Sequence, residues 1–284
     1  MPFLGMETDG RRAGMAGSGS LLTDSPSAVF GNGAASLAGD KKLGVGLFSG
    51  PWSGGDALYG AGGFYRMGEK NALLAGFRYL PGPRIETTDG QGFPLGVVRS
   101  RDMAFDVGYG RTIGRGLALS LTARYAIEDQ GFGEPLSAFA CDLGAMYTRP
   151  LRREGASWAI GLRLANLSPG VQGYALPSRA VLGGALTLPF SADHTVACAL
   201  DAGYGFAASG QFDAAAGVEY TFLRHGVVRG GYHLGSRSRG PGSYATLGCG
   251  LIIGPLRCDV AYRLAGEKTN PHNNTVLFSL AFLM

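Results

Sequence analysis

The chain has few charged residues, no basic tract and no long apolar run, and each absence excludes a class of protein. Charged residues make up 16% of its 284 residues, and the net charge is only +4. No Lys/Arg-rich tract with interleaved aromatics is present, so the basic footprint of a nucleic-acid-binding protein is missing. No apolar run approaches the ~20 residues of a membrane-spanning helix. A closed β-barrel remains compatible with this composition, because its ladder satisfies the backbone polar groups.

Catalytic and metal-binding patterns are also missing. The four histidines are scattered over the C-terminal third of the chain: His194, His225, His233 and His272. They belong to no HExxH motif, and the glycine-rich segments lack the GxxxxGK[ST] pattern of a phosphate-binding loop. The four cysteines form no CxxC pair with metal-site spacing. We therefore expect a non-enzymatic protein without catalytic residues, metal or cofactor.

What the sequence does contain is a regular two-residue alternation that begins near Lys41. In residues 117–127, one face carries Leu, Ala, Tyr and Ile, and Ser120, Thr122 and Arg124 lie opposite. Residues 138–148, 158–165 and 256–264 repeat this pattern. Successive side chains of a strand point to opposite faces, so period 2 predicts β-strands. The 49 glycines sit inside these apolar stretches, which indicates strands that need small side chains on one face.

Three features favour a membrane barrel over a soluble sandwich. The strands reach about ten residues, which suits a tilted membrane span and exceeds the usual ~5–6. Their polar faces are rich in small residues, and their apolar faces often end in Tyr, Trp or Phe, as in an aromatic girdle. We predict an all-β fold, a fourteen-stranded antiparallel transmembrane β-barrel over residues 41–284. Residues 1–40 do not alternate and are predicted to form an N-terminal plug or lumen-bracing segment, the alternative being a partly ordered tail.

The predicted strands cover residues 41–49, 56–66, 72–80, 101–111, 116–128, 137–148, 156–166, 178–189, 194–206, 211–223, 226–235, 243–253, 256–265 and 274–284. Because the number of strands is even, the first and the last strand both have their free chain end on the periplasmic side. The connections alternate in length, as they do in outer-membrane barrels. Most even ones are short turns, whereas most odd ones are longer and include Pro81–Ser100, Asp129–Leu136, Leu167–Pro177, Ser236–Gly242 and Ala265–Asn273.

Charged side chains on the polar strand faces are candidate lumen residues: Asp102, Asp106, Arg124, Asp142, Arg163, Asp201, Asp213, Glu219, Arg229, Asp259 and Arg263. They either brace the lumen as ion pairs or line a permeation path. A buried charge must be paired or hydrated, so both interpretations predict acid–base pairs or water.

The short periplasmic connections form a second candidate site because they carry many basic residues and few acids: Lys70, Arg111, Arg115, Arg149, Arg152, Arg153 and Arg224. Such a basic rim would steer an acidic protein partner. The alternative is that these residues form an ordinary solvent-exposed surface without a partner.

The cysteines Cys141, Cys198, Cys249 and Cys258 all fall on the apolar, lipid-facing side of their strands. There they act as small hydrophobic residues against lipid. Cys249 and Cys258 flank a tight turn, so a disulfide between them is an open alternative.

Several segments, in this order, resemble one family. Residues 12–19 (RAGMAGSG) and 24–34 (DSPSAVFGNGA) are similar to the opening of PorV/PorQ-type barrels, which belong with FadL-like fourteen-stranded outer-membrane proteins. Further similar segments are LANLSP at 164–169, LPSR at 176–179, LGG at 182–184, GVEY at 217–220, RGGY at 229–232, TLGCG at 246–250, DVAY at 259–262 and NP at 270–271. Two departures are Gly33, where the family usually has proline, and the ending Phe282-Leu283-Met284 in place of a terminal aromatic residue.

This resemblance implies a bacterial outer-membrane barrel of the type IX secretion system. Its partners would be outer-membrane lipid and other secretion proteins, namely ring, translocon, sortase-type or surface components. No secretory signal is visible after Met1, so we expect that the numbering follows signal removal. The competing hypothesis, from fold analogy, is a FadL-like channel for hydrophobic small molecules. A lumen plugged by residues 1–40 and bridged by ion pairs would favour docking, and an apolar tunnel with a lateral opening would favour the channel.

Overall fold

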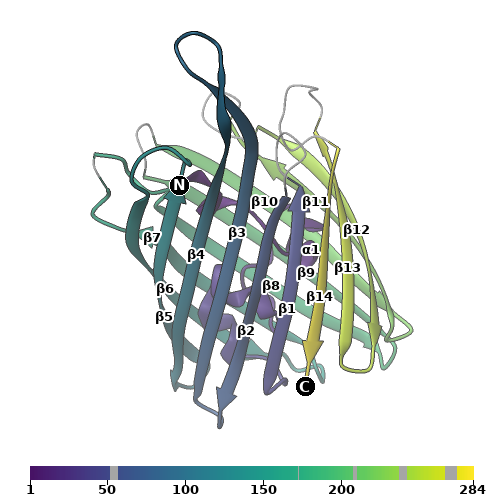
Figure 1. Cartoon of the computed structure of the whole chain (residues 1–284). Coiled ribbons are helices and arrows are strands. Elements are labelled where there is room, and N and C mark those ends of the chain that lie inside the picture. Colours follow the sequence, from purple (N-terminus) through teal and green to yellow (C-terminus); the bar gives the residue numbers. More distant parts are fainter. Residues whose placement is uncertain (52–56, 172, 207–209, 237–241, 266–273) are drawn as a thin grey trace.

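The computed structural model describes residues 1–51, 57–171, 173–206, 210–236, 242–265 and 274–284. Its fourteen strands form one closed antiparallel barrel, in which each strand pairs with its sequence neighbours and β1 closes against β14 (Figure 1). The predicted fold class is therefore confirmed. The strands are β1 Leu43–Pro51, β2 Ala57–Met67, β3 Asn71–Thr88, β4 Pro94–Gly114, β5 Leu117–Asp129, β6 Leu136–Pro150, β7 Ser157–Leu167, β8 Arg179–Ser191, β9 His194–Gly205, β10 Gln211–Phe222, β11 Gly226–Leu234, β12 Tyr244–Ile253, β13 Leu256–Ala265 and β14 Thr275–Leu283.

The two-residue alternation explains the closure. In β5, Leu119 and Leu121 are exposed on the outside, whereas Ser120, Thr122 and Arg124 are buried toward the lumen. Placing large apolar side chains outward leaves an interior lined by small and polar groups. This arrangement leaves room for a second layer of chain inside the barrel.

Aromatic rows mark the outer face near both ends. Phe77, Phe105, Tyr125 and Phe139 lie opposite one another across β3 to β6. The Phe77 and Phe105 ring centroids are 5.0 Å apart, and those of Tyr125 and Phe139 are 4.8 Å apart. Toward the other end, Tyr147 and Trp158 pack edge to face at 5.8 Å. The rows flank an apolar outer band, as in barrels that contact lipid.

The two ends of the barrel differ in their connections. Two-residue links such as Ala192-Asp193 and Gly254-Pro255 join strands at one end, here called the short-turn end, where the chain also finishes (Figure 1). The long-loop end carries connections such as 130–135 and 168–178. Parts of the predicted loops 236–242 and 265–273 lie outside the described residues, as do His272 and the Asn270-Pro271 motif.

One predicted loop is wrong. Residues 81–100 were expected to be a long connection, but β3 runs on to Thr88 and β4 begins at Pro94, so most of this segment is a two-stranded ribbon (Figure 1). The ladder shifts its register between Pro81 and Arg84. Pro81 and Pro83 are tolerated at this irregularity, because proline has no N–H to donate and an unpaired strand edge requires no donor.

The first forty residues fill the lumen. They form the short helices η1 (Pro2–Gly5), α1 (Gly10–Ala13), η2 (Pro26–Phe30) and η3 (Gly33–Leu37), seen inside the barrel in Figure 1. Most of their side chains are buried, with Phe3 and Val29 each only 1% exposed. No helix among the described residues is long and apolar enough to cross a membrane. We call residues 1–40 the plug.

Two strand glycines allow the plug to approach the wall closely. A Cβ on Gly217 would lie 2.5 Å from the Met15 Cβ, and one on Gly231 would lie 2.5 Å from the Met15 carbonyl carbon. Both distances are too short for real atoms, so any larger residue would push the plug away. Glycine inside these strands therefore marks a close backbone approach.

Candidate functional site: the plugged lumen

A first buried ion-pair network, here called the wall network, joins the five neighbouring strands β3 to β7. Arg124 stands at its centre, opposite Asp106 in the ladder. Its guanidinium donates to Asp106 Oδ1 at 2.6 Å and to Asp142 Oδ1 at 3.0 Å. Arg163 donates to Asp142 Oδ2 at 2.6 Å, and Arg78 Nη2 lies 3.5 Å from Asp106. Charges this deeply buried are tolerated because each has a partner of opposite sign.

Asn166 links this network to an interruption in the wall. Its backbone adopts a left-handed conformation, with φ +53°, at a register shift between β6 and β7. Asn166 N–H donates to Asp142 Oδ1 at 2.7 Å, its amide donates to the Pro177 carbonyl at 3.0 Å, and its Oδ1 accepts from Arg124. Asparagine suits this position because it tolerates positive φ. Beyond this point, β6 residues 136–140 have no ladder partner on β7.

A second network, the anchor network, ties the plug to β10, β11 and β13. Arg11 of the plug donates to both Glu219 oxygens, from Nη2 at 2.8 Å and from Nε at 3.0 Å. Arg229 and Arg257 each donate to Glu219 Oε2 at 2.7 Å. Asp259 accepts from the same two arginines, at 2.6 Å from Arg229 Nη2 and 3.1 Å from Arg257 Nε. The paired, two-bond contact of Arg11 fixes the plug in orientation as well as in position.

Hydrogen bonds to other strands also hold the plug in place. Ser20 donates from N–H and Oγ to the two oxygens of Asp201, at 3.0 and 2.9 Å. The Asn32 amide reaches the carbonyl of Ala145 in β6 at 3.0 Å. Thr246 Oγ1 donates to the Gly14 carbonyl at 3.0 Å. These contacts involve strands around the barrel, so the plug is held on several sides.

The plug also contains a buried ion pair of its own. Arg12 Nη2 lies 3.2 Å from Glu7 Oε2, and both side chains are 14% exposed. Burial disfavours the charged guanidinium, but the carboxylates of Glu7 and Asp201 outweigh burial and raise the pKa of Arg12 above its ordinary value. Arg12 therefore stays charged inside the lumen.

Toward the long-loop end the lumen contains an apolar cluster, beside the ion pair that joins the Met1 ammonium group to Glu128. Phe3 and Leu4 of the plug pack against small and aliphatic wall residues, and Leu176 of the β7–β8 loop joins them at 5% exposure. Ala138 and Ala140 in this cluster belong to the β6 segment that lacks a β7 partner. We call this cluster the apolar chamber; its buried members are Phe3, Leu4, Leu58, Leu80, Ala104, Ala126, Ala138, Ala140 and Leu176.

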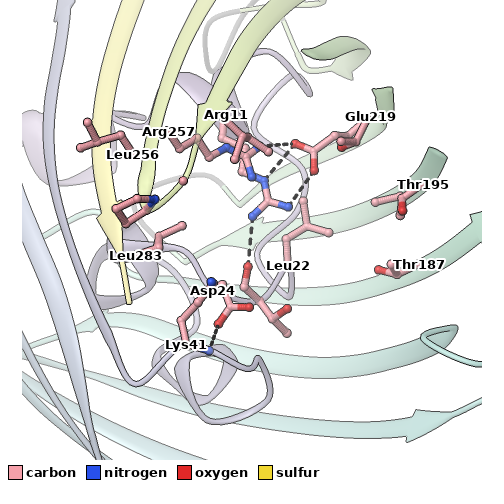
Figure 2. Close-up of a pocket in the computed structure, with 16 residues that line it drawn as sticks. Arg11, Leu22, Asp24, Lys41, Thr187, Thr195, Glu219, Leu256, Arg257 and Leu283 are labelled. Atoms are coloured by element: carbon pink, nitrogen blue, oxygen red, sulfur yellow. Dashed lines mark hydrogen bonds and ion pairs between the residues drawn. The ribbon is translucent and has the colours of Figure 1, made fainter. Parts of the chain in front are cut away.

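A cavity of about 320 Å³ opens near the short-turn end. Figure 2 shows Arg11, Glu219 and Arg257 converging at its inner side, with Thr187 and Thr195 across the opening. The Lys41 backbone N–H donates to Asp24 Oδ1 at 3.1 Å at its edge. The cavity is bounded by the anchor network on one side and has a mixed lining that includes Leu22, Leu256 and Leu283, whereas the apolar chamber lies toward the opposite end.

The predicted lumen charges are distributed over these features. The wall network contains Asp106, Arg124, Asp142 and Arg163, and the anchor network contains Glu219, Arg229 and Asp259. Asp201 binds Ser20 of the plug, and Asp213 accepts from Arg179 Nη2 at 2.7 Å. Arg263 is buried over the Tyr244 ring, 5.7 Å from its centroid, and Asp102 is half-buried near the long-loop end.

Six arginines that face the lumen or lie in the plug were not predicted: Arg11, Arg12, Arg66, Arg78, Arg179 and Arg257. Arg257 carried a usable signal, because it shares the polar face of its strand with Asp259 and Arg263, whereas Arg78 shares its face with Leu74 and Leu80. Arg11 and Arg12 carried none, since the segment around them has no periodicity.

All seven predicted rim residues are exposed. Arg224 pairs with Asp193 at 2.6 Å, Arg153 donates to the Phe190 carbonyl at 2.7 Å, and Arg149 donates to Tyr147 Oη at 2.5 Å. Within the described part of the chain, Lys70, Arg115 and Arg152 form no ion pair. Arg111 departs from the prediction, because it lies inside β4 on the outer face and not in a turn.

The cysteines lie on the outer face, and all four are free. Cys249 lies opposite Val260, and Cys258 lies opposite Leu251, so the two are diagonal neighbours and not a direct pair. The disulfide left open by the sequence is absent. Among the described residues, no group of three or more His, Cys, Asp or Glu side chains is arranged to hold a metal ion.

No family model matches the chain, and no curated protein matches it significantly. Solved structures are similar in fold. The Pseudomonas putida toluene transporter TodX has a TM-score of 0.61 at 11% identity, covering 98% of this chain and 97% of its own. The CymD monoaromatic hydrocarbon channel has a TM-score of 0.62 at 11% identity, covering 97% of each chain. A Pseudomonas aeruginosa FadL homologue has a TM-score of 0.52 at 12% identity, covering 97% and 95%.

These likenesses show a FadL-like fourteen-stranded barrel fold with an N-terminal segment. At such low identity they show the fold alone. The narrower resemblance to PorV/PorQ-type barrels stays a prediction.

Proposed function

We propose that this chain is a non-enzymatic β-barrel of the bacterial outer membrane that takes up small hydrophobic molecules. The observation that carries the proposal is the apolar chamber, which lies beside the unpaired β6 segment 136–140. Phe3 and Leu4 occupy this chamber in the closed lumen, as a hydrophobic solute would. The structural neighbours described as a toluene transporter and a monoaromatic hydrocarbon channel support the same substrate class.

The wall network limits the route that a solute can take. An apolar molecule in the chamber that moved further along the lumen would meet the buried charges around Arg124 and Asp142. Separating these charges from their partners is costly. A path through the wall above Asn166, where β6 lacks a ladder partner, avoids that cost.

The test is binding and uptake. Purified barrel should bind an alkylbenzene, and bacteria that carry the barrel should take it up faster than bacteria that carry an empty vector. Leu176→Asp, which places a carboxylate in the chamber, should abolish both effects. Leu223→Asp is the matched control, since Leu223 is exposed at the short-turn end. Absence of binding by the unmodified barrel would contradict the proposal.

A second candidate function is docking of secretion proteins of the type IX system, by the ring, translocon, sortase-type or surface components that the PorV/PorQ resemblance implies. The observation in its favour is the exposed basic rim, together with a lumen that the plug and the ion pairs occlude. Charge complementarity of this kind steers an acidic partner to the rim.

Gentle purification from membranes with an affinity tag tests this candidate. Recovery of secretion subunits at fixed stoichiometry, reduced by Arg152→Glu with Arg153→Glu, would support docking. Arg84→Glu with Arg99→Glu makes the same charge change at the opposite end and should leave recovery unchanged. Recovery of the barrel alone would contradict docking.

A further inference from the structure

A buried arginine, Arg78 of β3, borders the apolar chamber. In the ladder Arg78 lies directly opposite Ala104, and Leu80 follows two residues along the same face of β3; both neighbours belong to the chamber. Arg78 is only 1% exposed. The Phe30 ring of the plug covers its guanidinium, at 4.9 Å from the ring centroid, and the Leu4 carbonyl accepts from Nη1 at 3.0 Å. The chamber therefore ends on this side at a guanidinium group and not at an apolar wall.

Arg78 makes few hydrogen bonds for an arginine that is so deeply buried. Among the described residues, the bond to Leu4 is its only hydrogen bond, and its buried Nε and Nη2 atoms have no hydrogen-bond partner. Nη2 lies 3.5 Å from Asp106 Oδ2, which is beyond the usual length of a hydrogen bond. Buried donors without a partner are costly, so these N–H groups favour an oxygen acceptor.

Asp106 supplies the complementary half of the same site. Its Oδ1 accepts from Arg124 Nε at 2.6 Å, but its buried Oδ2 accepts no hydrogen bond from the described residues. A donor and an acceptor without partners thus lie 3.5 Å apart on neighbouring strands. A hydroxyl group fits this pair, because one oxygen can accept from Arg78 while its hydrogen is donated to Asp106. A carboxylate fits less well, because it cannot donate and Asp106 would repel it.

Small side chains line the chamber wall beside this pair. Ala104 lies opposite Ala126 in the ladder, and Ala126 lies opposite Ala138, so three methyl groups form a row across β4, β5 and β6. All three alanines are buried members of the chamber. A planar ring can lie flat against such a row, which larger side chains would prevent. Because the row begins opposite Arg78, a ring on the alanines reaches the donor–acceptor pair with one edge.

Entry of a ligand changes the bonding of Arg78. Phe3 and Leu4 fill the chamber in the closed lumen, so a ligand takes their place. Displacement of Leu4 removes the carbonyl that Arg78 binds. A hydrocarbon offers no acceptor in exchange, whereas a hydroxyl group restores a hydrogen bond to the guanidinium.

We propose that the chamber selects alkylphenols, with the ring on the alanine row and the hydroxyl group between Arg78 and Asp106. The inference rests on the proposed function and narrows its substrate class from small hydrophobic molecules to those that carry a hydroxyl group. A site built to bond a substrate hydroxyl discriminates against the analogue that lacks it, because the buried polar groups of the site are then left unpaired.

A matched pair of ligands tests the site: 4-ethylphenol and 4-ethyltoluene, which differ by a hydroxyl group against a methyl group of similar size. The purified barrel in detergent is titrated with each ligand by calorimetry. The signal from the Leu176→Asp barrel is subtracted, which removes partitioning into micelles. We expect 4-ethylphenol to bind at least about tenfold more tightly, as hydrogen bonds to charged groups imply.

Arg78→Met assigns this preference to the arginine, because methionine keeps an apolar side chain of similar length without the donors. The variant should lose the preference for 4-ethylphenol. Arg179→Met is the matched control, since Arg179 is a lumen arginine that pairs with Asp213 and is not a member of the chamber. It should keep the preference of the unmodified barrel. If Arg78→Met does not fold, the comparison of the two ligands on the unmodified barrel still decides.

Two results would overturn the inference. Equal affinities of the unmodified barrel for both ligands would mean that solvent satisfies Arg78 and Asp106, and hydrocarbon uptake would remain as the proposed function. A preference for 4-ethylphenol that persists in Arg78→Met would place the hydroxyl elsewhere. Binding of neither ligand would contradict the proposed function together with this inference.

Discussion

The two buried ion-pair networks are both built from arginine–carboxylate pairs, but they have different structural roles. The wall network joins side chains of five adjacent strands, and it touches the plug through Arg78, which donates to the Leu4 carbonyl at 3.0 Å and lies over the Phe30 ring. The anchor network brings Arg11, from the plug, onto Glu219 of β10. One network therefore shapes the wall at the Asn166 interruption, and the other holds the lumen closed.

The difference shows how a barrel of this size tolerates charge inside. Each carboxylate is shared by more than one arginine, so removal of a central group leaves several partners uncompensated, whereas removal of a peripheral group leaves the rest paired. The expected effects of substitution follow from this distinction.

The largest effect is expected at the centre of the wall network. Arg124→Leu leaves Asp106 and Asp142 buried with fewer partners, and breaking a buried pair in this way costs about 3–5 kcal/mol. Arg101→Leu removes a partly exposed pair with Asp129 and should cost ~0–1 kcal/mol. Thermal unfolding in detergent measures the loss of stability in both variants. Equal losses would mean that the buried wall network stabilises the barrel no more than an exposed ion pair does.

A smaller loss, with a different signature, is expected at the anchor. Arg11→Leu removes bonds to Glu219 that contribute about 1.5–3 kcal/mol, but Glu219 keeps Arg229 and Arg257. Amide exchange should therefore accelerate in residues 9–25 while the strands stay protected. If the strands lost protection together with the plug, the two networks would not be separable.

Steric displacement of the plug is a sharper test of the same idea. Gly231→Ala places a Cβ 2.5 Å from Met15, and overpacking of this kind costs about 1–3 kcal/mol. Gly230→Ala is the matched control, because its Cβ would meet nothing closer than the Thr246 carbonyl at 3.9 Å. We expect the first variant alone to accelerate exchange in the plug and to change the affinity for an alkylbenzene.

The smallest effect is expected outside both networks. Arg115→Glu changes an exposed residue at the short-turn end, so the unfolding free energy should stay within ~0.5 kcal/mol of the unmodified protein. A larger change would show that the rim contributes to barrel stability and not only to its surface charge.

The sequence predicted the barrel because its decisive signal is local. Alternation in segments such as 117–127 reports which face of each strand is buried, and a closed sheet preserves that distinction in every strand. The same local reasoning failed at residues 81–100. Pro81, Gly82 and Pro83 are typical of a loop, yet the ladder resumes at Arg84 after a register shift.

The anchor could not be predicted because it joins residues far apart in the chain. Arg11 and Glu219 are separated by 208 positions, and nothing in the local pattern around Arg11 indicates a partner. Asn166 shows the same limit, since its role depends on Asp142 and Arg124 from strands that only the closed barrel brings beside it.

The sequence by itself determined most of the strands, their outer and inner faces and many of the charges that turn inward, because side-chain direction in a strand follows from period 2. Only the tertiary structure decided which charges meet, where the wall is interrupted and how the plug is held. Those features depend on ring closure, which places distant segments of the chain within hydrogen-bond reach of one another.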